Sequence, residues 1–454
     1  MLRRNHELDI TGGNIATGVL LFAAPVIVTN ILQMLYNAAD MIVVGRFCGD
    51  TSLAAVGATG AVTGLIINLF MGFGAGVSAL VSRYLGARDR ERTHDAVHTS
   101  VALALACGVV LAMFGIFLSR AMLNATGTPD NVIDYATQYM QIVFVGTPAN
   151  LMYNFGAAIL RSMGDTKRPL YFLTTAGIIN VLLNLFFVIV FNMNVAGVAL
   201  ATIISQYISA ALVIITLLRS NSDCRLIVRD VRFHLGELKL IVGIGFPAGL
   251  QTCMYSLSNV LIQSSVNSFG SKAMSGFSAG ANIFNFANTA MDAFTATAIV
   301  YAAQNFGAHN FERIKKSANI CFAYTFALGT VLGYTLVHFG PQLIGIYAPN
   351  NAEVAALGMK YMIMFKFITG FGGANGVATS ALRGMGRSFV PMAVSIGGIC
   401  VFRVIWIMTA FVKWHTLETI YVSYPISWII TAVINTVLFY CVWNKMRKNA
   451  DKTV

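Results

Sequence analysis

The sequence predicts an all-α polytopic membrane protein with twelve transmembrane helices in two six-helix lobes. Hydrophobic residues make up 57% of its 454 residues and charged residues only 11%, and the mean hydropathy is +0.71. Soluble proteins average about 25% charged residues, and a soluble core could not hide this much apolar surface from water. The composition therefore excludes a soluble enzyme. The net charge of +12 lies in loops, so no nucleic-acid partner is predicted.

The twelve helices are predicted from apolar runs. A stretch of about 20 apolar residues is long enough to cross a bilayer as a helix. The approximate bounds of the twelve runs are 15–45, 53–82, 95–119, 131–160, 169–192, 195–218, 238–268, 273–304, 314–340, 353–382, 388–412 and 418–444.

The Lys and Arg residues predict the orientation of these spans. The N-terminus, the even-numbered loops and the C-terminal tail hold 23 of the 30 basic residues, whereas the odd-numbered loops hold five. Basic residues accumulate in cytoplasmic loops. Both termini are therefore predicted to be cytoplasmic, in a multi-pass protein of the cell inner membrane.

An internal repeat organises the chain. The segment 160–164 (LRSMG) recurs at 382–386 (LRGMG), and Pro25 and Pro247 share the same offset of 222 residues. Each repeat holds six spans, so both halves run through the membrane in the same direction. Such a plan serves transporters that rock one lobe against the other around a central cavity. The predicted division is an N-terminal lobe at 1–218, a cytoplasmic linker at 219–239 and a C-terminal lobe at 240–454.

Polar residues within the first lobe predict an ion site. Asp40 lies roughly 9 Å below the outer end of its span, and Asn184 and Thr202 lie roughly 12 Å and 10 Å deep. Asn180 is one turn from Asn184, on the same helix face. These oxygen ligands suit Na⁺, and a desolvated carboxyl suits a proton. The equivalent positions in the second half are apolar, so folding alone does not require the set. The alternative is a structural hydrogen-bond network.

The second lobe carries its own ionisable residues. Asp292 and Lys366 are close enough in depth to form a buried pair, which is either a coupling element or a static salt bridge. Arg403 is expected to cap backbone carbonyls or to snorkel toward the interface. His94 and His98 share a helix face but lack the Glu of a metalloprotease motif, so no metal site is predicted there.

Two prolines within spans are predicted to bend their helices. Pro25 and Pro247 each remove one hydrogen bond from the helix ladder. Pro25 precedes Asp40 on one helix, so a bend there could couple ion occupancy to cavity shape. The alternative is a fixed kink.

The chain resembles the multidrug and toxic compound extrusion (MATE) family. The resemblance rests on the segments 36–40 (YNAAD) and 160–165 (LRSMGD), on Asn180 with Asn184, and on 197–202 (GVALAT). It implies a bacterial antiporter that exports organic, often cationic, compounds or drugs in exchange for H⁺ or Na⁺. It also implies no enzymatic activity, no cofactor, a monomer in the lipid bilayer, and no metal beyond Na⁺.

The resemblance assigns residues to these roles. Its cation site maps onto Asp40, Asn180, Asn184 and Thr202. The seventh span lacks the carboxylate of the NorM-like branch, which places the chain closer to the DinF-like branch. Asn184 stands where that branch often has Asp, which implies weaker Na⁺ binding. The candidates for the substrate cavity are Gln33, Tyr36, Asn37, Asn154, Asn259, Asp292 and Lys366.

The sequence does not exclude two other functions. A lipid-linked precursor flippase of the same superfamily would need several cationic residues facing its cavity, and the spans offer only Lys366 and Arg403. A membrane-embedded enzyme would need paired carboxylates or a Ser/His set at one depth. ATP-driven pumping is disfavoured because the sequence has no G-x-x-x-x-G-K-[ST] loop. The sequence does not identify the substrate or decide between H⁺ and Na⁺.

Overall fold

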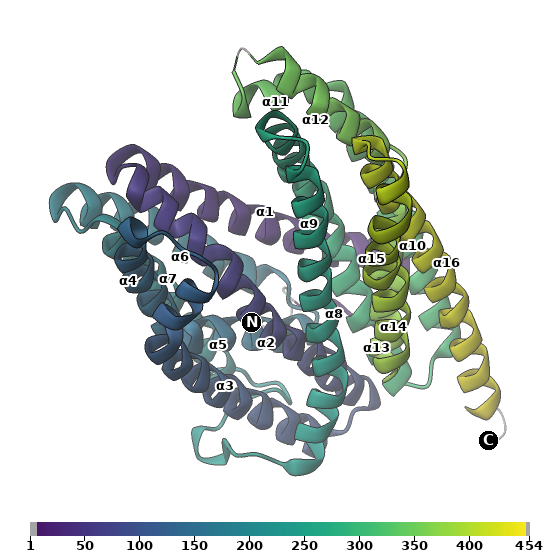
Figure 1. The fold of residues 1–454 in the computed structure, drawn as a ribbon. Coiled ribbons are helices and arrows are strands. Elements are labelled where there is room, and N and C mark those ends of the chain that lie inside the picture. Colours follow the sequence, from purple (N-terminus) through teal and green to yellow (C-terminus); the bar gives the residue numbers. More distant parts are fainter. Residues whose placement is uncertain (1–6, 350, 451–454) are drawn as a thin grey trace. The chain divides into compact units, whose positions relative to one another are not determined.

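The computed structural model describes residues 7–349 and 351–450, and these residues contain helices but no strand (Figure 1). The first half of the chain forms α1 (Ile15–Phe47), α2 (Asp50–Ala87), α3 (Arg90–Ala125), α4 (Asp130–Val145), α5 (Thr147–Ser162), α6 (Lys167–Leu185), η1 (Phe186–Val190), α7 (Asn194–Leu218) and η2 (Val228–Asp230). The second half forms α8 (Leu235–Asn267), α9 (Ser271–Gly307), α10 (Phe311–His338), α11 (Gly340–Tyr347), α12 (Ala352–Phe365), α13 (Thr369–Gly384), α14 (Phe389–Ser395), η3 (Ile396–Val401), α15 (Phe402–Trp406), η4 (Ile407–Phe411) and α16 (Leu417–Ala450).

The predicted spans coincide with these helices. In the described part of the chain, nine helical segments are long and apolar enough to cross a membrane, and two further spans are bent helix pairs. The bend is 43° between α4 and α5 and 49° between α12 and α13. The remaining predicted span coincides with α9, which is long enough but carries Asn282, Asn285, Asn288 and Asp292. The predicted all-α class with twelve spans is therefore confirmed.

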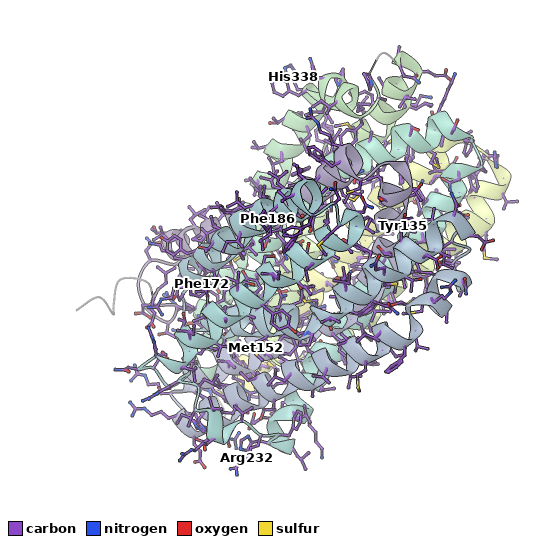
Figure 2. All side chains as sticks on the ribbon, turned by 90° about the vertical axis from the view of Figure 1, so that its left-hand side faces the viewer. Tyr135, Met152, Phe172, Phe186, Arg232 and His338 are labelled. Carbon is purple, nitrogen blue, oxygen red and sulfur yellow. The ribbon has the colours of Figure 1, made fainter. Side chains whose placement is uncertain are left out.

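The surface of the helices is apolar where a soluble protein would be polar. Phe186 and Tyr135, labelled in Figure 2, are 48% and 42% exposed. Many more large apolar side chains are exposed along α1, α3, α6 and α16. Exposed apolar surface of this extent marks contact with a membrane or a partner. Together with the span lengths, it makes the protein a multi-pass membrane protein.

The bend between α4 and α5 has a local cause. Pro148 lies in the first turn of α5, where its missing N–H leaves no intrahelical hydrogen bond unmade. The Thr147 hydroxyl donates to the Gly108 carbonyl of α3 at 3.0 Å. The broken span is thus held against α3 at the point where it bends.

The chain forms two compact units. Unit 1 comprises Met1–Leu8 and Val28–Gly249, and unit 2 comprises Asp9–Ile27 and Leu250–Val454. In unit 1, α2, α3, α4, α5 and α7 pack together, and in unit 2, α9 packs with α10, α12 and α13, which in turn contacts α16. These units differ from the predicted lobes because α1 and α8 are each divided between them. Pro25 and Pro247 precede the two points of division, where a missing backbone donor weakens the helix.

Residues 9–27 belong to unit 2 because specific contacts hold them there. The Arg313 guanidinium donates to the carbonyl oxygens of Ile10 at 3.1 Å and Gly13 at 3.0 Å, and also to that of Gly12. The ring of Phe22 packs edge-on against Tyr301, with ring centroids 6.0 Å apart. Arg313, in the first turn of α10, thus fixes the chain that leads into α1.

Candidate functional site

Three helices of unit 1 bring the predicted ion-site residues together. Asp40 comes from α1, Asn180 and Asn184 from α6, and Thr202 from α7. Helices α6 and α7 lie side by side (Figure 1). Asn180 and Asn184 are four residues apart, so the α-helical repeat places both amides on the face toward Asp40. The tight approach of α1 to α6 depends on Gly177, whose missing side chain makes room for the ring of Tyr36.

The four polar side chains form one hydrogen-bonded group. Asn184 Nδ2 donates to Asp40 Oδ1 at 2.5 Å and lies 3.3 Å from Asn180 Oδ1. The Thr202 hydroxyl lies 3.2 Å from Asp40 Oδ2, and Asn180 Nδ2 donates to that hydroxyl at 3.4 Å. Each carboxylate oxygen of Asp40 thus faces a different donor, one from α6 and one from α7.

The Asp40 carboxylate has no cationic partner. It is 9% exposed, and the ion pairs found among residues 7–349 and 351–450 do not include it. The Asn184 Oδ1 atom, also buried, has no hydrogen-bond partner and remains available as a ligand. A buried carboxylate is costly unless a cation or a proton neutralises it. The group is therefore suited to a proton or to a small hard cation bound by oxygen ligands.

A small cavity of about 80 Å³ opens beside Asp40. Gln33, Tyr36 and Asn37 line it as predicted for the substrate cavity, but its volume fits an ion and a few waters rather than an organic compound. The predicted Asn154 does not line this cavity, because its amide donates to the Asn150 carbonyl one turn earlier at 2.8 Å.

Other polar residues of this cavity were not predicted from the sequence. They are Asn150, Ser205, Gln206 and Ser209. The three residues of α7 follow Thr202 at helical spacing, so a search for residues sharing its face would have found them.

A larger cavity of about 450 Å³ lies within unit 2. The predicted Asn259 and Asp292 line it, and Asp292 is exposed to it. Its volume lies within the range of small-molecule sites. Most of its lining was not predicted from the sequence. It comes from α8, α9, α12, α13, η3, α15 and α16 and includes Asn282, Asn285, Asn288, Tyr361, Phe365, Arg403, Tyr424 and Trp428.

Two predictions about the basic residues of unit 2 are wrong. Lys366 forms no ion pair with Asp292 in the described structure; its ammonium lies 4.4 Å from the centre of the Tyr334 ring. Lys366 is at the break between α12 and α13 and does not line the cavity. Arg403 neither snorkels nor caps carbonyls, because it is 3% exposed and contacts the side chains of Ser427 and Asn259.

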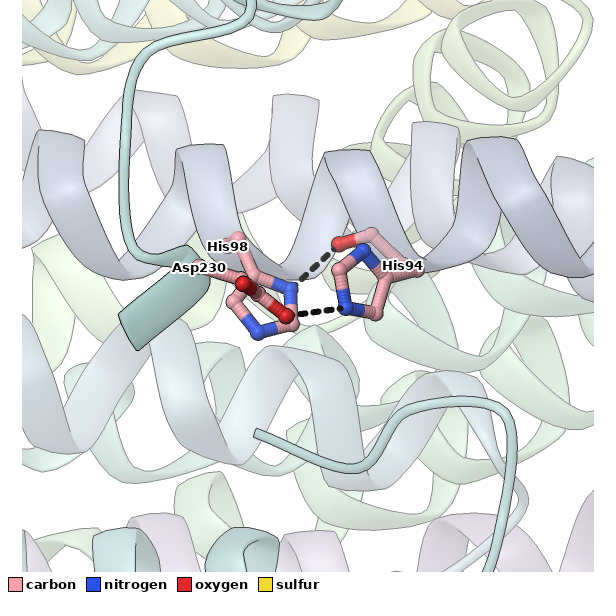
Figure 3. Close-up of side chains that lie close together, drawn as sticks. All are labelled: His94, His98 and Asp230. Carbon is pink, nitrogen blue, oxygen red and sulfur yellow. Dashed lines mark hydrogen bonds and ion pairs between the residues drawn. The ribbon is translucent and has the colours of Figure 1, made fainter. Parts of the chain in front are cut away.

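Figure 3 shows a third group of polar side chains, His94 and His98 of α3 with Asp230 of η2. Their potential ligand atoms lie within 4.8 Å of one another, as in a metal site. However, the Ile227 N–H donates to His98 Nε2 at 2.9 Å, so His98 Nδ1 carries the proton and donates to the His94 carbonyl at 2.7 Å. His98 therefore has no free lone pair for a metal. Its ring joins the 219–239 segment to α3.

This arrangement predicts the effect of removing the His98 ring. We expect His98→Ala to leave the Ile227 N–H without its acceptor, which costs about 1 kcal/mol and raises local opening of the segment about fivefold. The measurement is the rate of limited trypsin cleavage at Arg225, Arg229 and Arg232. Cleavage of the wild-type protein should not respond to Zn²⁺ or to EDTA. A metal-dependent cleavage rate would contradict the hydrogen-bonding role and favour a metal site.

The fold and these cavities define a polytopic membrane protein with a buried ion-type site and a separate cavity large enough for a solute. This combination is typical of secondary transporters. The MatE family profile matches the chain over residues 25–186 and 247–409. The chain therefore belongs to the MatE family. The two matched segments begin 222 residues apart, which equals the offset of the predicted internal repeat.

Individual relatives agree with this membership. The probable multidrug resistance protein YoeA of Bacillus subtilis is 27% identical over 435 residues, which cover 94% of this chain and 93% of YoeA. The multidrug export protein MepA of Staphylococcus saprophyticus is 23% identical, with 86% of each chain covered. Among solved structures, an outward-facing multidrug resistance MATE transporter of the MOP superfamily has a TM-score of 0.89 at 21% identity, with 97% of this chain and 98% of that chain covered.

Proposed function

We propose that the protein is a secondary active multidrug efflux transporter that exports organic cations in exchange for H⁺ or Na⁺ by alternating access. The observation that carries the proposal is the buried Asp40 carboxylate, which has hydrogen-bond donors from α6 and α7 but no cationic partner in the described structure. Such a group binds and releases a cation when its access to water changes. The named activities of YoeA and MepA support multidrug export.

The unit 2 cavity supports the proposed binding of an organic compound. Aromatic side chains of Tyr361, Phe365, Tyr424 and Trp428 supply ring faces, and Asp292 supplies a carboxylate. Ring faces and a carboxylate together attract organic cations. The unit 1 cavity lacks the volume for such a compound. We therefore infer that the ion binds in unit 1 and that the organic compound binds in unit 2.

The flippase alternative receives less support from the same cavities. A lipid pyrophosphate requires several cationic side chains, and the described lining of the unit 2 cavity contributes Arg403 alone. The lining of the cavity beside Asp40 contributes none. A membrane-embedded enzyme is disfavoured for a similar reason, because one carboxylate, Asp292, faces the larger cavity among its described lining residues. We propose that the protein works without a cofactor, as a monomer, in the cytoplasmic membrane with both termini in the cytoplasm.

The test is dye transport in inverted vesicles under separately imposed pH and Na⁺ gradients. We expect ethidium to accumulate inside the vesicles when the lumen is acidic or rich in Na⁺. The gradient that drives this accumulation identifies the coupling ion. Collapse of that gradient by an ionophore should stop accumulation. Vesicles without the protein are the control. No ethidium movement under either gradient would contradict the proposed function and favour the flippase.

A further inference from the structure

The unit 2 cavity contains a cationic side chain that the proposed export of cations does not require. Arg403 lies on α15 and is 3% exposed, yet it lines the cavity. Its Nε donates to the Ser427 hydroxyl at 3.2 Å, and its Nη1 donates to Asn259 Oδ1 at 3.4 Å. The guanidinium carbon lies 4.0 Å from the centre of the Tyr424 ring. These three contacts hold the guanidinium plane in one orientation.

The charge of Arg403 is not neutralised by the protein. No ion pair among residues 7–349 and 351–450 includes Arg403, and Asp292, which shares the cavity, is not within ion-pair distance. The nearest acidic residue along α16, Glu418, pairs with Lys360 instead, at 2.7 Å. A buried guanidinium without an anion is costly within a membrane, and such residues commonly mark functional sites.

One nitrogen of Arg403 is also without a hydrogen-bond partner. Its Nη2 atom is buried and makes no hydrogen bond in the described structure. An unpaired buried donor destabilises the folded protein, and more so when it is charged. A guanidinium presents its donors in a planar fork that matches a carboxylate or a phosphate. The missing partner therefore has the chemistry of an oxyanion.

The backbone around Arg403 is irregular. Helix α15 is flanked on both sides by π-helical segments, η3 (Ile396–Val401) and η4 (Ile407–Phe411). π-Helical turns are rare overall, and those that occur lie frequently at functional sites. Two of them in one span indicate that the direction of Arg403 into the cavity is specified by the fold.

We propose that Arg403 binds an anionic group of the transported compound, a carboxylate or a phosphate. Asp292 on α9 accepts the cationic part of the same compound, and the aromatic rings of α12 and α16 contact its apolar body. The cavity then binds compounds that carry an anionic group beside the cation more tightly, while purely cationic compounds still bind through Asp292 and the rings. This inference rests on the proposed efflux function, because it assigns the chemistry of the exported compound.

The test measures binding to the purified protein in detergent, with matched fluorescent probes and no gradient. Rhodamine B carries a free carboxylate, and its ethyl ester carries none. FMN and riboflavin form the equivalent pair for a phosphate. By fluorescence polarisation, we expect Arg403→Gln to weaken the binding of rhodamine B or of FMN at least tenfold. We expect the partner of that pair that lacks the anionic group, the cationic ester or neutral riboflavin, to change less than about twofold. The affected pair identifies the anion.

Two further variants keep the test decisive. Lys413→Gln removes an exposed positive charge outside the cavity and should leave all four affinities unchanged. Asn259→Asp places a carboxylate beside Nη1, and we expect it to abolish the preference for the anionic probe without removing Arg403. If Arg403→Gln does not fold, the Asn259→Asp variant alone tests the inference. Equal weakening of both members of a pair, or no weakening of either anionic probe, would overturn the inference.

These outcomes are separate from those of the dye-transport experiment. Binding in detergent does not depend on a gradient, so an anion preference that persists in a protein without ethidium transport would contradict the proposed function alone. If the protein transports ethidium but Arg403→Gln leaves all probe affinities unchanged, the result would contradict the anion subsite alone.

Discussion

Asp40→Asn is expected to lower the initial rate of gradient-driven ethidium uptake into inverted vesicles at least tenfold. The substitution preserves the shape of the side chain and one oxygen that can accept from Asn184 or Thr202, which lie 2.5 Å and 3.2 Å from the carboxylate. It removes the negative charge that we propose binds a proton or Na⁺. The amide stays neutral whichever side of the membrane the site is open to. The protein therefore loses the step that couples cation movement to dye movement.

A matched control is available in the same unit. Asp134→Asn makes the same chemical change at an exposed carboxylate that pairs with Arg120 at 3.0 Å, and exposed pairs contribute about 0–1 kcal/mol. We expect this variant to transport at the wild-type rate. Both variants should elute as folded protein in size-exclusion chromatography. Wild-type transport by Asp40→Asn would reduce Asp40 to a member of a structural hydrogen-bond network.

The grouping of Asp40, Asn180, Asn184 and Thr202 could be predicted from the sequence because helix geometry governs where these residues lie. Asn180 and Asn184 are one turn apart, and the depth of Asp40 and Thr202 follows from counting residues along a span. The unit 2 cavity could not be predicted in this way. Its residues come from several helices that are distant in the sequence, and neither bends nor π-helical segments leave a periodic pattern. The polar spacing of Asn282, Asn285 and Asn288 was the available signal.

The two errors in unit 2 have the same origin. Similar depth in the membrane is not sufficient to pair Lys366 with Asp292, because a pair also requires both side chains to face each other. The break after α12 carries Lys366 toward Tyr334 instead. The prediction for Arg403 follows the common behaviour of arginine in membrane spans. Its actual partners, Asn259 and Ser427, lie on α8 and α16, and this packing has no local sequence signature.

The packing of α3 against the bent α4–α5 span leads to the second large expected effect. We expect Gly108→Ala to destabilise the protein by about 2 kcal/mol or more, the upper range for overpacking a closely packed interior. A Cβ at residue 108 would lie 2.4 Å from the Pro148 Cα and 2.9 Å from the Pro148 nitrogen, both backbone atoms that no rotamer change can move. The displacement would also break the hydrogen bond from Thr147 to the Gly108 carbonyl.

A matched control variant, Gly64→Ala, should not lower the stability of the protein. Gly64 lies within α2, and a Cβ there meets nothing within 4 Å. Ala is more favourable than Gly in a helix by roughly 0.5–1 kcal/mol, so Gly64→Ala should leave the melting midpoint in detergent unchanged or raise it. The measurement is the loss of the monodisperse elution peak with temperature for both variants. Because both changes add one methyl group to a helical glycine, an equal shift in the two midpoints would show that helix propensity, not the contact with Pro148, explains Gly108. A lower midpoint for Gly108→Ala alone would show that this glycine is required for α3 to support the bent span beside it.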